Sequence, residues 1–252
     1  MPEPTRGVLV VIPARYASAR FPGKPLAPIA GKPMIEHVVT RCRSAQSEPR
    51  VLVATEDARI VQAVQKFGGE AILTRADNKT GTDRVAEIAA HVPAEIYVNV
   101  QGDEPLIDPA TIDAVVSAMT EDPEIQIATP CAVITRQNDV MDPNIVKVVL
   151  DFDANALYFS RAPVPWVRDT GAAVAARHLK HIGVYAFRRD VLLEFPTLPP
   201  GELERVEQLE QLRWLENGFH IRVVESDYDA VSVDVPADVD RVEKLLHDRA
   251  AS

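Results

Sequence analysis

Three cationic side chains gather in a short loop near the start of the chain, where they could bind an anion. Arg15, Arg20 and Lys24 follow the apolar residues 7–13 and stand five and four positions apart. Arginine grips phosphate oxygens through a planar fork and lysine supplies a compact charge, while Gly23 lets the backbone approach a ligand closely. A nucleoside triphosphate needs several such cations. The loop therefore predicts a phosphate site, and a solvated basic loop is the alternative.

The loop is not one of the common phosphate-binding motifs. A Walker loop needs Gly-Lys followed by Ser or Thr, but here Gly23-Lys24 is followed by Pro25. The dinucleotide fingerprint G-x-G-x-x-G is also absent from the sequence. We therefore expect any nucleotide to be held by a different loop.

Two aspartates are candidates for holding a metal ion beside the phosphates. Asp103 lies in the run QGDEP at residues 101–105, directly after the apolar residues 95–100. Ligands bind beyond the carboxyl ends of parallel strands, and Mg²⁺ takes few protein carboxylates together with water and phosphate oxygens. The run QGDEP is also typical of a turn, and Asp234 before Pro236 is also typical of a helix start. The local sequence leaves both alternatives open.

Strands and helices alternate along the chain, and these elements must position the candidate residues. Continuously apolar runs, which are typical of buried parallel strands, alternate with segments that have helical periodicity. This pattern predicts an α/β fold, Rossmann-like and three-layered, with a mostly parallel central sheet. The expected strands are residues 7–13, 50–55, 71–73, 95–100, 124–134, 145–150 and 219–224. The expected helices are residues 34–45, a segment capped by Asp57, residues 82–91, a segment starting at Asp108-Pro109, and residues 203–216 and 236–248.

The second half of the chain is less regular and predicts an elaboration of the same domain. Two strand-like runs flank a stretch at residues 163–176 that contains Pro, Gly and Ala, and Trp166 there looks exposed. We expect one domain over residues 1–252, with a smaller irregular or antiparallel subdomain. The expected parts are a nucleotide-binding core at about residues 7–124 and 188–248 and an insertion at about residues 125–187.

Composition indicates a globular protein without general affinity for polyanions. The chain has 252 residues, 46% apolar and 25% charged, which is enough for a full core. A formal charge of −10 argues against nucleic acid or anionic membranes as partners. Cys42 and Cys131 are too few for a disulfide framework, so we expect reduced core thiols. The longest early apolar run, residues 8–12, is too short for membrane insertion, and we expect a cytoplasmic location.

A set of ordered motifs resembles one enzyme family over nearly the whole chain. Each motif is moderately specific, and the ordered set is highly specific for the 3-deoxy-manno-octulosonate (Kdo) cytidylyltransferases, or CMP-Kdo synthetases. The motifs are VIPARYASARFPGKPL at residues 11–26, TRAD at 74–77, TGTDR at 80–84, VNVQGDEP at 98–105, NIVKVVL at 144–150, ALYFSR at 156–161, HIGVY at 181–185, LEQLR at 209–213 and VD at 233–234.

The resemblance implies an enzyme that activates Kdo with CTP, giving CMP-Kdo and pyrophosphate for lipopolysaccharide biosynthesis. The anomeric hydroxyl of Kdo would attack the α-phosphorus of CTP. The resemblance also implies Mg²⁺ as cofactor, and it favours the metal role of Asp103 and Asp234 over the turn and the helix start. A homodimer built largely by the insertion is implied as well.

The resemblance further implies roles for individual residues. Catalytic roles fall to Arg15, Lys24, Asp103 and Asp234. CTP-binding roles fall to Ala14, Arg15, Arg20, Lys24, Thr80, Gly81, Arg84, Gln101 and Asp103. Sugar-binding roles fall to Gln101, Tyr158, Ser160, Arg161, His181, Tyr185, Glu210 and Gln211, with Arg161 as the expected partner of the Kdo carboxylate.

Simpler roles compete for several of these residues. Thr82 could cap a helix over residues 83–91, His181 could be a hydrogen-bonded core histidine, and Glu210 and Gln211 could lie on a solvated helix face. Glu56 stands where the family usually has Asp, and we assign it no role.

Two other functions remain open at this point. One is a cytidylyltransferase for a related acidic sugar, such as 8-amino-Kdo or a nonulosonate. The other is a non-catalytic protein that binds a nucleotide sugar, although Asp103 and Asp234 together with the cationic loop argue against it.

Overall fold

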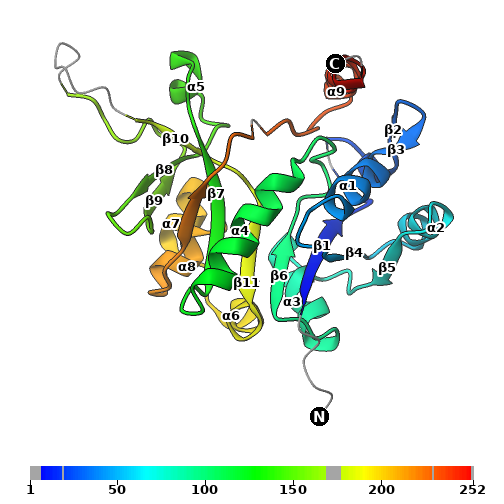
Figure 1. The fold of residues 1–252 in the computed structure, drawn as a ribbon, viewed down its shortest axis with the longest axis horizontal. Helices are drawn as coiled ribbons and strands as arrows, with labels where there is room; N and C mark the ends of the chain where they lie inside the picture. Colours follow the sequence, from blue (N-terminus) through cyan, green and yellow to red (C-terminus); the bar gives the residue numbers. More distant parts are fainter. Residues whose placement is uncertain (1–6, 19, 169–176, 229, 251–252) are drawn as a thin grey trace.

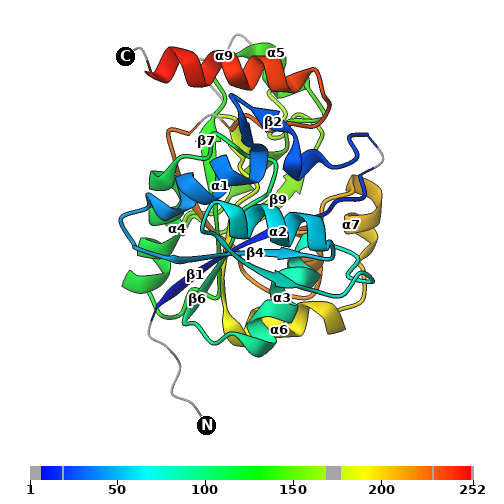
Figure 2. The same cartoon turned by 90° about the vertical axis from the view of Figure 1, so that its right-hand side faces the viewer.

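Helices cover both faces of one long sheet, as the alternating pattern predicts (Figure 1; Figure 2). The structure, a computed structural model, describes residues 7–18, 20–168, 177–228 and 230–250. The last part of the stretch at 163–176 therefore lies outside the described residues. The strands are β1 Val8–Ala14, β2 Pro28–Ile29, β3 Lys32–Pro33, β4 Arg50–Thr55, β5 Glu70–Leu73, β6 Ile96–Asn99, β7 Ile127–Val133, β8 Lys147–Leu150, β9 Ala156–Ser160, β10 Leu179–His181, β11 Tyr185–Arg188 and β12 Arg222–Glu225.

Short connections join these strands to helices on both sides of the sheet. The helices are η1 Lys24–Leu26, α1 Met34–Arg43, α2 Ala58–Lys66, α3 Gly81–His91, α4 Pro109–Glu121, α5 Gln137–Met141, α6 Arg189–Glu194, η2 Phe195–Thr197, α7 Glu202–Glu207, α8 Leu212–Glu216 and α9 Asp238–Ala250.

The sheet has a parallel half and an antiparallel half. Strands β5, β4, β1 and β6 lie side by side in that order and run parallel. Strand β11 then lies antiparallel between β6 and β7, and β12 pairs in parallel with β7. Antiparallel β10, β8 and β9 extend the sheet to its other edge. The strands of residues 125–187 therefore continue the central sheet.

The two faces of β1 explain the three layers. Val10 and Ile12 pack with α1, α2 and α4, whereas Leu9 and Val11 pack with α3, α6 and α8. Because successive strand residues point to opposite faces, a fully apolar strand requires helices on both sides. Cys42, like Cys131, is a buried free thiol, as expected.

Two details of the helices differ from the expectations. Thr80, not Thr82, caps α3, and its side chain forms a reciprocal capping box with Asp83. The single helix expected over residues 203–216 is two helices, because Gln208 takes a left-handed backbone conformation with φ of 54° and ends α7.

Helix α9 closes the fold at the same end as the cationic loop. Its Val242 packs with Ile29 and Met34 in a small apolar cluster that also contains Val233. Figure 2 shows α9 lying across β2 and α1. No helix within the described ranges is long and apolar enough to cross a bilayer.

Candidate active site

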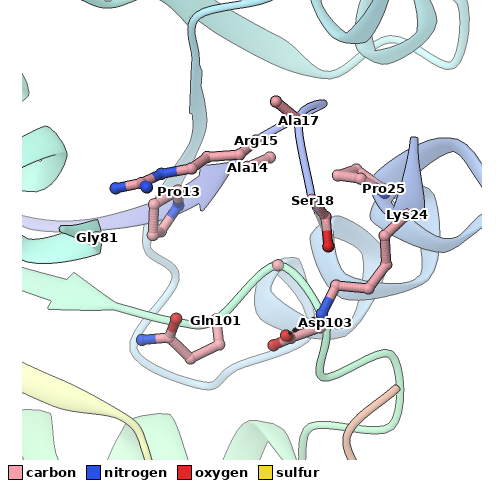
Figure 3. Close-up of a pocket in the computed structure, with 11 residues that line it drawn as sticks. Pro13, Ala14, Arg15, Ala17, Ser18, Lys24, Pro25, Gly81, Gln101 and Asp103 are labelled. Atoms are coloured by element: carbon pink, nitrogen blue, oxygen red, sulfur yellow. Dashed lines mark hydrogen bonds and ion pairs between the residues drawn. The ribbon is translucent and has the colours of Figure 1, made fainter. Parts of the chain in front are cut away.

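The cationic loop after β1 forms one wall of a cavity of about 270 Å³ at the carboxyl end of the parallel strands (Figure 3). The opposite wall comes from the segment after β6. A Cβ on Gly102 would lie only 2.9 Å from the Pro13 carbonyl oxygen, so glycine lets these two strand ends approach each other. The cavity is lined by Pro13, Ala14, Arg15, Ala17, Ser18, Lys24, Pro25, Gly81, Gln101, Gly102 and Asp103.

Both candidate metal-binding aspartates lie at this loop and are paired with its cations. Lys24 Nζ donates to Asp103 Oδ2 at 2.5 Å and to the Val233 carbonyl oxygen at 2.9 Å. Arg20 Nη2 donates to Asp234 Oδ1 at 3.2 Å. The Val233 N–H also donates to the Asp103 carbonyl oxygen at 2.9 Å. These bonds bring Asp234 close to Asp103, although the two are far apart in sequence, but neither Asp234 nor Arg20 lines the cavity itself.

Glu104 lies beside Asp103 but has a different environment. Its side chain is buried and accepts a hydrogen bond from the Tyr228 hydroxyl at 3.0 Å. Burial, reinforced by the neighbouring Asp103 charge, raises the pKa of Glu104 to about 7. Asp103 therefore offers the accessible carboxylate at this strand end.

Arg15 and Arg84 lie on either side of the loop and are held differently. Arg15 Nη2 donates to the Asn78 carbonyl oxygen at 3.1 Å, and Figure 3 shows its side chain extending away from Lys24. Arg84 does not line the cavity: it is fully buried, its Nη2 lies 3.1 Å from Glu56 Oε2, and it donates to Thr74 Oγ1. Burial lowers the pKa of the Arg84 guanidinium.

Glu56, to which the sequence assigned no role, connects this buried pair to the cationic loop. Glu56 Oε1 accepts the backbone N–H of Tyr16, the residue after Arg15, at 2.9 Å. Arg59 lies over the Tyr16 ring, with its guanidinium carbon 3.4 Å from the ring centroid. An acidic residue directly after β4 can be seen in the sequence. Its pairing with Arg84 cannot, because Arg84 lies far away along the chain.

A second cavity of about 290 Å³ adjoins the first and shares Gly81 and Gln101 with it. The two cavities together could hold two reacting molecules side by side. Five of the eight expected sugar-binding residues line it, and Asn99 is an addition. The lining residues are Gly81, Asn99, Gln101, Val146, His181, Gly183, Tyr185, Leu209, Glu210 and Gln211.

The break between α7 and α8 carries Glu210 and Gln211 into this cavity. Gln211 is buried, and Glu210 accepts a hydrogen bond from the Thr82 hydroxyl. Burial raises the pKa of Glu210. The alternative of a solvated helix face is therefore wrong for these two residues.

Tyr158, Ser160 and Arg161 do not line either cavity, contrary to the expected sugar cluster. Ser160 Oγ donates to Glu207 Oε1 at 2.7 Å, and Arg161 donates to the Glu207 and Pro143 carbonyl oxygens at 2.7 and 2.9 Å. Glu207 is also among the causes of a raised pKa at Tyr158, after burial. These hydrogen bonds connect the β9 segment to the end of α7. The Arg161 guanidinium therefore points toward backbone carbonyls.

The remaining cavity residues are neutral. Burial lowers the pKa of His181 from 6.5 to about 3 and raises that of Tyr185 well above its usual range. Asn99 is buried, and its Oδ1 has no hydrogen-bond partner within the part of the chain that the structure describes. Sequence reasoning missed Asn99 because an asparagine inside an apolar strand carries no signal of its own.

Comparison with known proteins gives a consistent result. A cytidylyltransferase family model matches residues 9–225. The 3-deoxy-manno-octulosonate cytidylyltransferase of Solibacter usitatus is 50% identical over 241 residues, covering 96% of this chain and 95% of that protein. That of Geobacter sulfurreducens is 50% identical over 247 residues, covering 94% of this chain and 99% of that protein.

Solved structures agree with this result. A structure of CMP:2-keto-3-deoxy-manno-octonic acid synthetase in complex with CTP superposes with a TM-score of 0.91 at 45% identity, covering 96% of this chain and 99% of that one. A glucose-1-phosphate thymidylyltransferase from Bacillus anthracis, described as putative in its name, shares only the fold, with a TM-score of 0.68 at 15% identity over 96% of both chains. Two adjoining cavities, a cationic loop and full-length similarity agree: this chain belongs to the cytidylyltransferase family, among the 3-deoxy-manno-octulosonate cytidylyltransferases.

Proposed function

We propose that this chain transfers the cytidylyl group of CTP to Kdo, forming CMP-Kdo and releasing pyrophosphate. Its similarity to Kdo cytidylyltransferases along nearly the whole chain supports this reaction. The observation that carries the proposal is the clustering of Lys24, Arg20, Asp103 and Asp234 at the first cavity, where Lys24 and Asp103 line the cavity and Arg20 and Asp234 pair beside it.

The shared lining of the two cavities supports an assignment of one substrate to each cavity. The triphosphate of CTP occupies the first cavity, where Arg15 and Lys24 neutralise its charge, and Kdo occupies the second. Gln101 and Gly81 border both cavities, so the anomeric hydroxyl of Kdo meets the α-phosphorus at this boundary. Lys24 stabilises the negative charge that develops on the departing pyrophosphate, because a fixed cation costs no reorganisation during the reaction.

Asp103 and Asp234 are the residues that would hold Mg²⁺. Their carboxylate oxygens are ligands that Mg²⁺ prefers, and two protein carboxylates suffice when phosphate and water complete the shell. Among the residues that the structure describes, no group of three His, Cys, Asp or Glu side chains could hold a metal. Bound there, Mg²⁺ would neutralise phosphate charge and polarise the α-phosphate.

We also propose a homodimer and a cytoplasmic location. Phe152, Leu157 and Trp166 are exposed apolar side chains on or beside the edge strand β9. Such a patch supports an interface between two copies of the chain. The buried free thiols Cys42 and Cys131 suit a reducing compartment.

Pyrophosphate release tests the reaction. The protein is mixed with CTP, Mg²⁺ and Kdo, and pyrophosphate formation is measured beside panels containing ATP, UTP, 8-amino-Kdo and a nonulosonate. We expect release with CTP and Kdo. Release only with another acidic sugar would favour that relative, and no release with any divalent metal would contradict the enzyme function.

The variant Asp103→Asn tests the carboxylate itself. We expect turnover to fall by at least about 100-fold, because the substitution keeps the shape but removes the charge that holds the metal. Asp240→Asn on α9 is the matched control, since this exposed aspartate lies outside both cavities. Thermal unfolding of both variants should stay near that of the unsubstituted protein. Unchanged turnover in Asp103→Asn would remove Asp103 from the site.

A further inference from the structure

The hydroxyl of Thr129 contacts the ring of His181 from inside the protein. Thr129 lies on β7, is fully buried and does not line the second cavity, whereas His181 on β10 does. Thr129 Oγ1 is 3.0 Å from His181 Nε2. The same oxygen lies 2.7 Å from the Val184 carbonyl oxygen and 3.3 Å from that of Ile182.

This arrangement determines which atom carries the proton between Thr129 and His181. A threonine hydroxyl has one proton and two lone pairs, and a carbonyl oxygen can only accept. The hydroxyl proton must therefore point to a carbonyl, with the short contact to Val184 as its best partner. Toward His181 the hydroxyl can only accept, so His181 Nε2 must carry a hydrogen.

The second ring nitrogen of His181 is then fixed as well. Desolvation lowers the pKa of this histidine to about 3, so the ring is neutral at physiological pH. A neutral imidazole with a proton on Nε2 has a free lone pair on Nδ1. Phe159 and Tyr185 hold the ring in place, with centroids 5.0 and 5.3 Å away, and Nδ1 has no hydrogen-bond partner among the described residues.

We propose that Thr129 is a positioning residue that holds His181 in the Nε2–H tautomer, so that Nδ1 accepts a hydrogen bond from a hydroxyl of the bound sugar. The proposal rests on the proposed function in assigning the second cavity to the acidic sugar. Asn99, whose buried Oδ1 has no hydrogen-bond partner among the described residues, and Glu210 line the same cavity and offer further acceptors. Together with Nδ1 of His181, these acceptors favour a ligand that carries several hydroxyl donors, and an amino group could donate to Nδ1 in the same way.

Nitrogen-15 NMR tests the tautomer without any turnover. Long-range proton–nitrogen correlations of the labelled protein distinguish the two ring nitrogens by their protonation, and His181→Gln identifies the signals. We expect a protonated Nε2 and an unprotonated Nδ1 at neutral pH. A proton on Nδ1 instead would overturn the proposal even in an active enzyme.

Three threonine variants connect the tautomer to sugar binding. Thr129→Val keeps the shape but removes the acceptor, and we expect a mixture of tautomers and a KM for Kdo raised about tenfold. Thr129→Ser keeps the hydroxyl, so both the single tautomer and the KM for Kdo should match those of the unsubstituted protein. Thr111→Val is the matched control, because Thr111 is equally buried but its hydroxyl pairs with Ser226 outside the cavity.

The division of the kinetic effect separates positioning from general damage. The KM for CTP should change less than about twofold in Thr129→Val, because the first cavity is untouched. Kdo analogues that each lack one hydroxyl complete the test: one analogue should bind the unsubstituted enzyme about tenfold more weakly, but bind Thr129→Val as well as Kdo does.

Each outcome bears on one proposal only. Equal effects of Thr129→Val and Thr129→Ser, or a tenfold rise in the KM for CTP, would overturn the positioning role. Absence of pyrophosphate release by the unsubstituted protein would instead overturn the proposed function, while the tautomer measured by NMR would still stand.

Discussion

At the scale of single residues, the chemistry depends on charges that are held in pairs. Lys24 and Asp103 form a pair that lines the first cavity, and Arg20 and Asp234 form a second pair beside it. Arg84 with Glu56 forms a third pair, which is buried rather than lining the cavity. In the proposed reaction the first two pairs exchange partners for phosphate and metal, whereas the third pair supports the loop that carries Arg15.

The variant Glu56→Gln tests this supporting pair. The amide can still accept the Tyr16 N–H, but the buried Arg84 loses the carboxylate that is in contact with it. We expect the free energy of unfolding to fall by about 3 kcal/mol, measured by urea denaturation, and the KM for CTP to rise. Glu56→Asp keeps the charge and should recover most of the stability.

A matched exposed pair provides the control for Glu56→Gln. Glu70→Gln removes the carboxylate partner of Arg50, and both side chains of that pair are about half exposed. Because water screens such pairs, the expected loss is below about 1 kcal/mol with no change in KM. Equal losses in the two variants would show that the pair of Glu56 and Arg84 is not special.

At the scale of secondary-structure elements, helix ends position the site. The capping box of Thr80 and Asp83 starts α3 at Gly81, which borders both cavities. The end of α7, held by Ser160 and Arg161 of the β9 segment, turns the chain toward the second cavity. The capping box and the hydrogen bonds at the end of α7 each fix the direction of the backbone, and this direction positions the residues that line the cavities.

The variant Thr80→Ala tests the first of these helix ends. Loss of the cap should lower the free energy of unfolding by about 1 kcal/mol and raise the KM for CTP severalfold, because Gly81 loses its anchor. Asp108→Ala removes the cap of α4, which lies outside both cavities, and should lower stability similarly with an unchanged KM. Denaturation and initial-rate kinetics measure both effects, and a normal KM in Thr80→Ala would count against this role.

At the scale of the whole molecule, the proposed reaction and the proposed dimer use different parts of one sheet. Strands β1 and β6 of the parallel half end at the cavities. The antiparallel strands extend the sheet to β9 at its other edge (Figure 1), where Leu157 is exposed. A sheet with unpaired, apolar edge groups is prone to association. The proposed dimer covers this edge.

Light scattering of the variant Leu157→Glu tests the proposed dimer. Leu157 on β9 is 62% exposed, and a buried charge at an interface would disfavour association. We expect the molar mass to fall from that of a dimer to that of a monomer. Leu73→Glu on β5, at the opposite edge and 57% exposed, should leave the mass unchanged. A monomeric unsubstituted protein would contradict the proposal.

The sequence by itself determined the fold class, the family and most of the first cavity. Fully apolar strands and amphipathic helices predict the layered sheet, because their periodicity is a local property. Arg15, Lys24 and Asp103 are predicted because they lie in the segments after two strands, β1 and β6. The structure places all three on one cavity.

Only the tertiary structure decided which residues meet across long separations. The burial of Arg84 against Glu56, the capture of α7 by Arg161 and the contact of Thr129 with His181 each join elements that the chain pattern treats independently. Local periodicity shows which face of an element is apolar, but a hydrogen bond or ion pair depends on two side chains meeting in space. The packing of the whole molecule determines which side chains come close enough to form such a contact.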